Sequence, residues 1–169
     1  SFSGQASAYY SQPFFEASGW IEKNGERYNV SGSAWADHEW SSQVLSKTQE
    51  GWDWFSLNFE SKEKLMLFRV REHNKNDFYY GSWIQPSGKI ERIQQNEIHL
   101  KSKKMDLENT TYNTTWDLEI KKLGVDITIN AINDRSHMET IFPYWEGPIS
   151  FTGTHKGNGY LEMTGASNP

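Results

Sequence analysis

Three consecutive ionisable residues stand between two tryptophans, in the segment from Trp35 to Trp40. If this segment is an extended strand, Asp37 and Glu39 share one face with Trp35. His38 then shares the opposite face with Trp40. An indole ring packed against a carboxyl group removes water from the charged form, which raises the pKa and makes the group a general acid usable near neutral pH. The pattern therefore predicts a proton-donating site among aromatic rings.

The same ionisable residues also suit a purely structural role. They could be held in hydrogen bonds or ion pairs, with Arg69 or Arg71 as candidate partners, and such networks shift pKa values as well. A metal site is disfavoured, because no second histidine follows His38 at ligand spacing. A serine nucleophile is disfavoured too, because no G-x-S-x-G pattern surrounds Ser41 or Ser42. An acid site and a structural network both stay open.

Two further groups of aromatic residues have polar neighbours. The first is Trp52-Asp53-Trp54, and the second is Tyr144-Trp145-Glu146. The hydroxyl, indole and carboxylate groups of the second could line a ligand pocket. Alternatively, the rings fill the core at one end of a barrel, with their polar tips bonded to backbone carbonyls.

The elements that must position these residues follow a period of two through most of the chain. The residues from Trp52 to Phe59 alternate between two faces, and so do those from Leu65 to Arg71, which predicts strands. Turn signals separate the predicted strands at short and regular intervals. We therefore predict one all-β domain of about nine or ten strands, in a sandwich or barrel. The predicted connections are Asn24-Gly25, Ser61–Lys64, Pro86-Ser87-Gly88, Leu123-Gly124 and Gly157-Asn158-Gly159.

The composition agrees with a globular domain and excludes several functions. Leu, Ile, Val and Phe number only 33 of the 169 residues, but aromatic residues make up 15% of the chain. Because each ring can bury about 150–250 Å², aromatic residues can build the core. The net charge of −5, with no basic run longer than that at 101–104, excludes a nucleic-acid footprint. No apolar stretch reaches the roughly 18 residues of a membrane span, and the absence of cysteine excludes disulfides and thiolate catalysis.

Several of these segments, taken together, resemble one family. In order and wording they are similar to the AttH-like family, which is related to the carotenoid 1,2-hydratases (hydroxyneurosporene synthases, CrtC-like proteins). The resemblance runs from about Tyr9 to Gly165. The segments that carry it are Tyr9-Tyr10-Ser11-Gln12-Pro13, Gly32–Ser41, Gly51–Phe55, Lys64–Arg71, Tyr144-Trp145-Glu146-Gly147 and Gly159–Gly165.

The resemblance implies a lipocalin-like antiparallel β-barrel of about 8–10 strands over residues 1–169. In that family such domains occur in tandem, so this chain is expected to be the C-terminal half of a two-domain protein, with a preceding lipocalin-like domain as partner. The start at Ser1, without Met or a signal-peptide pattern, agrees with a piece of a longer protein. The family also implies a bacterial periplasmic, envelope-associated or secreted location.

For function, the resemblance implies binding of a hydrophobic small molecule, polyene or lipid-like, with a possible link to an export system. The alternative is a hydratase or hydrolase that acts on an isoprenoid or lipid-like substrate without a cofactor. In that alternative Asp37 or Glu39 is the acid, His38 assists, and indole faces stabilise a carbocation. The expected ligand-binding residues are Trp35, Trp40, Trp52, Asp53, Trp54, Tyr144, Trp145 and Glu146.

Two other interpretations remain beside these. A carbohydrate-binding or glycosidase-type β-sandwich also uses tryptophans and carboxylates, the latter about 5–9.5 Å apart if they are catalytic. A structural domain would use the same rings only to fill its core. Neither a metal nor a cofactor is expected.

Overall fold

The structure, a computed structural model, describes residues 7–41, 45, 48–103, 112–141 and 143–165. The chain divides into two compact units, Ser1–Ser46 and Lys47–Pro169. Each unit is described by itself. That residues 1–169 form one domain, the second half of a longer protein, stays a prediction.

The first unit is a long antiparallel hairpin of β1 (Ser7–Lys23) and β2 (Glu26–Ser41). Asn24 and Gly25 connect the strands, both with positive φ, as a tight two-residue turn requires. The predicted Asn24-Gly25 turn is therefore confirmed. The pairing shifts by one residue between Gln12 and Phe15, which marks a β-bulge. Most side chains of this hairpin are exposed, large aromatic ones included.

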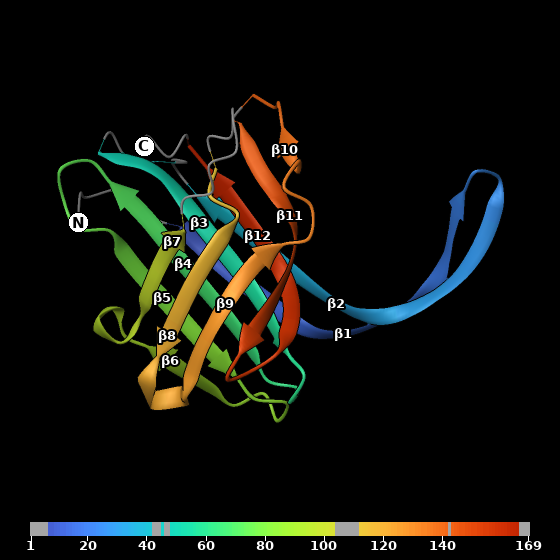
Figure 1. Cartoon of the computed structure of the whole chain (residues 1–169), viewed down its shortest axis with the longest axis horizontal. Coiled ribbons are helices and arrows are strands. Elements are labelled where there is room, and N and C mark those ends of the chain that lie inside the picture. The colour runs from blue at the N-terminus through green and yellow to red at the C-terminus, as the bar shows by residue number, and fades with distance from the viewer. Residues whose placement is uncertain (1–6, 42–44, 46–47, 104–111, 142, 166–169) are drawn as a thin grey trace. The chain divides into compact units, whose positions relative to one another are not determined.

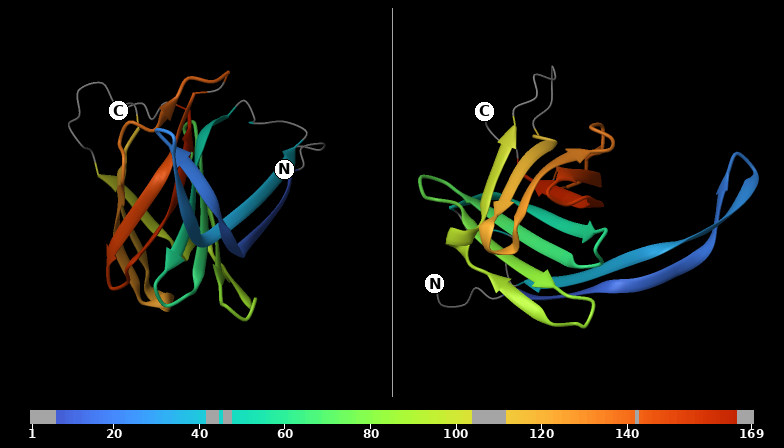
Figure 2. Two further views of the ribbon diagram at one scale, coloured as in Figure 1. Left: turned by 90° about the vertical axis from the view of Figure 1, so that its right-hand side faces the viewer. Right: turned by 60° about the horizontal axis from the view of Figure 1, so that its bottom comes forward.

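The second unit is a ten-stranded antiparallel sheet. Figures 1 and 2 show this sheet curled into a half-barrel. Its main path runs in the order β6-β5-β4-β3-β12-β11-β9-β8-β7, and β10 pairs with β11. The all-β, lipocalin-like fold class is confirmed. The bounds are β3 (Gln49–Phe59), β4 (Lys64–Glu72), β5 (Phe78–Ile84), β6 (Ile90–Ile93), β7 (His99–Lys103), β8 (Thr115–Ile120), β9 (Val125–Ala131), β10 (His137–Met138), β11 (Tyr144–Gly153), β12 (Gly157–Thr164), and the 3-10 turns η1 (Gln95–Glu97) and η2 (Lys121–Leu123).

Aromatic and branched aliphatic side chains fill the inner face of the curled sheet. Alternation places Phe55 and Leu57 of β3 on this face, opposite Leu67 and Leu65 of β4. Trp116 packs edge-on against Phe55 with ring centroids 5.5 Å apart. An apolar ligand would have to displace these buried side chains to lie among them. The core thus confirms that rings compensate for the small number of aliphatic residues.

Three of the four turns predicted within the sheet unit join neighbouring strands as expected. Ser61–Lys64 connects β3 to β4, with Lys64 already the first residue of β4, while Pro86-Ser87-Gly88 lies between β5 and β6 and Leu123-Gly124 lies between β8 and β9. The fourth prediction was wrong, because Gly157 and Gly159 lie inside β12. A Cβ at Gly157 would meet the carbonyl of Asn58, so these glycines allow β12 to approach β3 closely.

One lysine links the edge strand β6 and the turn η1 that follows it to the turn between β8 and β9. Lys122, in the turn between β8 and β9, lies 2.9 Å from Glu97 and 3.1 Å from Glu91 of β6. Its Nζ also donates to the carbonyl of Arg92 at 3.1 Å. The hydrogen bond to Lys122 lowers the pKa of Glu97, and the same bond raises the pKa of Lys122. The contact therefore persists across neutral pH, and it weakens in acid as Glu97 protonates and in strong base as Lys122 loses its proton.

Replacing Lys122 by Met is expected to speed amide hydrogen exchange in β6, because the edge strand loses its connection to the turn after β8. Lys121→Met is the matched control, since the Lys121 ammonium lies 3.9 Å from Glu119 and is 77% exposed. Equal protection of β6 in both variants would show that Lys122 does not hold the edge. Exchange measured by mass spectrometry distinguishes the two results.

Candidate functional site

A carboxylate on the hairpin is held by a phenol and an indole. The Tyr9 hydroxyl donates to Asp37 Oδ1 at 2.6 Å, and Trp35 Nε1 donates to the same oxygen at 2.9 Å. Among the described residues, no donor meets Oδ2. Two donors on one oxygen fix the orientation of the carboxylate and leave the second oxygen for proton transfer.

The remaining ionisable residues of this segment follow the predicted alternation. Glu39 lies on the Asp37 face, where it accepts a hydrogen bond from the hydroxyl of Ser7. His38 lies on the other face, between the rings of Tyr10 and Trp40, with centroids 5.9 and 5.3 Å away. Trp40 is 56% exposed, so this aromatic face is open to solvent. The hairpin therefore presents one carboxylate face and one aromatic face.

A buried charge cluster lies on the inner face of the sheet, around Asp53. Its carboxylate is 1% exposed and is paired with Arg71 and, at 3.2 Å, with Arg69. Arg71 also donates to the carbonyls of Thr164 and Gly165, at the end of β12. Burial raises the pKa of Asp53, and the guanidinium groups of Arg71 and Arg69 oppose that rise. The two arginines considered as partners for the hairpin carboxylates thus bind Asp53, in an arrangement that ties β3, β4 and β12 together.

The neighbours of Asp53 lie on the outer face of the same sheet. Trp52 Nε1 donates to Glu162 at 2.8 Å, and the Trp52 ring lies 6.2 Å from that of Tyr144. Register places Trp54 and Glu146 on either side of Glu162. These rings and carboxylates form a second group of aromatic and acidic side chains, separate from the one on the hairpin. Burial raises the pKa of Tyr144, and the nearby carboxylates of Glu162 and Glu146 raise it further.

The predicted site residues therefore fall into three groups. The hairpin carries the first, the outer face of the sheet the second, and the inner face the third. Trp145 belongs to the inner group, where it is 1% exposed and its Nε1 donates to the carbonyl of Asp134 at 2.9 Å. The groups are Trp35, Asp37, His38, Glu39 and Trp40; Trp52, Trp54, Tyr144 and Glu146; and Asp53 and Trp145.

Sequence reasoning did not assign Tyr9 or Glu162 to the site. Counting the register back from Asn24-Gly25 without a bulge places Tyr9 opposite Trp40, on the wrong face for Asp37. The bulge moves Tyr9 opposite Glu39 and so brings it beside Asp37. Glu162 could have been found from the sequence through the period-two alternation of residues along β12.

Within the described ranges, no group of three or more His, Asp or Glu side chains could hold a metal ion. The described part of the chain also holds no helix of the length and apolarity that a bilayer crossing requires.

A model of the AttH-like family matches residues 1–166. A crystal structure described as an AttH protein from Nitrosomonas europaea superposes with a TM-score of 0.83 at 29% identity, over 96% of this chain and 53% of that one. Kievitone hydratase from Nectria haematococca superposes with a TM-score of 0.76 at 17% identity, over 94% of this chain and 53% of that one. The chain thus spans about half the length of both. No curated protein sequence matches it.

Proposed function

The chain belongs to the AttH-like family, and we propose that it contributes to a cofactor-independent addition of water to an apolar, unsaturated small molecule. The observation that carries the proposal is the Asp37 carboxylate, oriented by Tyr9 and Trp35 through one oxygen. The hydratase among the fold neighbours agrees with this chemistry, although at 17% identity it is a likeness of fold.

The proposed reaction needs one group that gives a proton and takes it back. The protonated Asp37 carboxyl gives its proton to one alkene carbon, and the positive charge forms on the more substituted carbon. A water molecule then adds to that carbon, and its surplus proton returns to the carboxylate. Tyr9 and Trp35 stabilise the carboxylate between the two transfers. Indole and phenol faces stabilise the cation.

The proposal includes a second lipocalin-like domain that precedes this chain and covers the hairpin. Removing water from a carboxyl group favours its neutral, proton-donating form. The exposed rings of Tyr10 and Trp40 suit such a cover. Both solved neighbours are about twice as long as this chain, which leaves room for one. A periplasmic, envelope or secreted location belongs to the same proposal and is tested by cell fractionation.

The direct test is incubation of the chain with acyclic isoprenoid alkenes in ¹⁸O-labelled water. Mass spectrometry is expected to find a product heavier by one labelled water, formed in proportion to protein. Alkene recovered unchanged, with the folded protein at high concentration, would contradict hydration. Running the same reaction with the preceding domain added distinguishes an incomplete site from a wrong assignment.

Binding without turnover is the second candidate function, and the solvent-exposed aromatic face of the hairpin favours it. Tyr10, His38 and Trp40 pack together there as a platform for an apolar molecule. Titration with an acyclic polyene, a fatty acid and an oligosaccharide, followed by tryptophan fluorescence, separates the candidates. Saturable quenching by polyene or fatty acid, without labelled product, would favour a carrier that works with an export system.

A further inference from the structure

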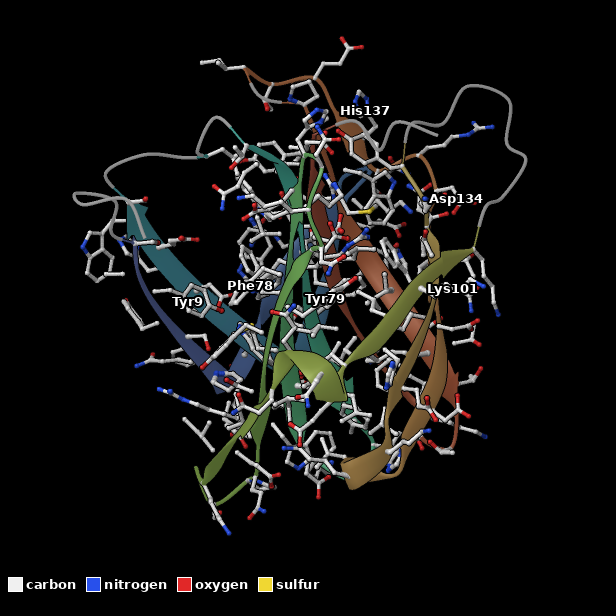
Figure 3. The ribbon with its side chains drawn as sticks, turned by 90° about the vertical axis from the view of Figure 1, so that its left-hand side faces the viewer. Tyr9, Phe78, Tyr79, Lys101, Asp134 and His137 are labelled. Carbon is white, nitrogen blue, oxygen red and sulfur yellow. The ribbon has the colours of Figure 1, made fainter. Side chains whose placement is uncertain are left out.

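Two adjoining grooves lie where the curled sheet is open, between β5 and β7. Their volumes are about 560 and 700 Å³, and Tyr79 and Ile98 line both. Figure 3 looks onto this opening, with Tyr79 on β5 and Lys101 on β7. β6 pairs only with the second half of β5, from Gly81 onward, so the first half of β5 borders the opening.

The larger groove is lined mostly by residues with amide side chains. Four residues with primary amides and one with a carboxylate line it, beside one aromatic ring and one aliphatic side chain. Each amide offers one acceptor oxygen and two donor hydrogens, and a hydroxyl group needs one partner of each kind. The amides are Asn76, Gln94, Gln95 and Asn96, the carboxylate is Asp77, the ring is Tyr79 and the aliphatic side chain is Ile98.

Two of these side chains, those of Asp77 and Gln95, are held in place before any ligand binds. Arg69 donates to Asp77 Oδ2 through Nη2 at 2.7 Å and Nε at 2.8 Å. Gln95 Nε2 donates to the backbone carbonyl of Asp77 at 3.2 Å, which joins the β4–β5 loop to η1. The Gln94 backbone N–H donates to Glu97 at 2.6 Å, as part of a capping box. The fixed side chains of Asp77 and Gln95 lose little freedom on binding, which favours affinity.

The residues that line the groove are unfavourable for the binding of apolar and anionic ligands. An apolar molecule would remove water from four amides without replacing their hydrogen bonds, which is unfavourable. An anion would meet the Asp77 carboxylate, while the guanidinium of Arg69, which binds that carboxylate, is already paired with Asp77 and Asp53. A neutral molecule rich in hydroxyl groups satisfies the amides and the carboxylate together, and its C–H face can lie on the ring of Tyr79.

We propose that this amide-lined groove binds a neutral saccharide, one or two sugar units in size. The site is separate from Asp37 and does not depend on the proposed hydration. Its shallow, open form suits a sugar at the end of a longer chain as well as a free one, and both present the same hydroxyl groups.

The test uses the whole chain labelled with ¹⁵N and titrated with glucose, N-acetylglucosamine and maltose. At least one sugar is expected to shift the side-chain amide signals of Asn76 and Asn96 saturably. The double variant Asn76→Ala/Asn96→Ala is expected to weaken binding by about tenfold or more, since hydrogen bonds are lost at two positions. Asn158→Ala, an exposed amide on β12, is the matched control and should bind as the parent does.

Three results would overturn the proposal. One is the absence of saturable shifts with all three sugars, and another is sugar binding that survives the double variant. The third is binding of unstructured peptide, titrated in parallel, where sugars have no effect. If the double variant is unfolded, Asn96→Asp keeps the shape but removes two donor hydrogens, and equal affinity in that variant would count against the groove.

Discussion

Replacing Asp53 by Ala is expected to lower the free energy of unfolding by about 3–5 kcal/mol, because it leaves buried guanidinium groups without their counter-charge. Arg71 would keep its carbonyl partners at Thr164 and Gly165, and Arg69 would keep Asp77 and the ring of Trp116, but neither would keep the Asp53 carboxylate. Since domains of this size are stable by about 5–15 kcal/mol, a large part of the total stability would be lost. Urea unfolding followed by tryptophan fluorescence measures the change.

Asp117→Ala is the control for this prediction. Asp117 also forms an ion pair, with Lys103 at 2.7 Å, but its side chain is 42% exposed. Exposed pairs contribute about 0–1 kcal/mol, so this variant should stay close to the parent. If both variants lost the same small amount, Asp53 would not be the centre of a structural cluster, and a role in ligand binding would regain support.

Replacing Asp37 by Asn is expected to reduce the rate of the proposed hydration by about 10²–10⁴-fold. The amide has the shape of the carboxylate and can still accept hydrogen bonds from Tyr9 and Trp35. It can neither give nor take the proton that the reaction moves. Because the hairpin position is exposed, the free energy of unfolding should change by less than about 0.5 kcal/mol. Turnover and urea unfolding are measured on the same preparation.

Variants of two residues close to Asp37 test whether the loss of turnover is specific to the Asp37 carboxylate. Glu39→Gln removes a carboxylate from the same face of the hairpin, and turnover should persist if Asp37 is the acid. Tyr9→Phe removes one donor to Asp37 and should lower kcat while KM and the free energy of unfolding stay close to those of the parent, a split that a merely structural loss would not produce. Full activity of the Asp37→Asn variant would contradict the assignment.

The alternation of residues within strands and the residues at turns predicted much of this fold. The alternation from Trp52 to Phe59 separates Asp53 on the inner face from Trp52 and Trp54 on the outer face. Asn24-Gly25 locates the hairpin turn. These features depend on a few adjacent residues, so that the sequence carries them directly.

What the sequence could not supply depends on contacts between distant strands. The bulge between Gln12 and Phe15 transfers Tyr9 to the Asp37 face; Pro13 within it is a signal for a bulge, but a proline alone does not give the size of the register shift. Gly157 and Gly159 are typical of a turn, but here they allow close approach of β12 to backbone on β3. The interior pairing of Asp53 with two arginines likewise follows from strand register, whereas the hairpin carboxylates were equally plausible partners on the sequence alone.

The open edge of the sheet at β7 bears on how the protein behaves in concentrated solution. Among the described residues, β7 pairs only with β8, so its outer backbone groups are available to a strand of another molecule. Lys101 and Lys103 lie along this short edge and are exposed. Charged edge lysines oppose such pairing, because stacking copies would bring like charges together. Acetylation of these lysines, or their replacement by valine, is therefore expected to favour strand-by-strand aggregation through β7.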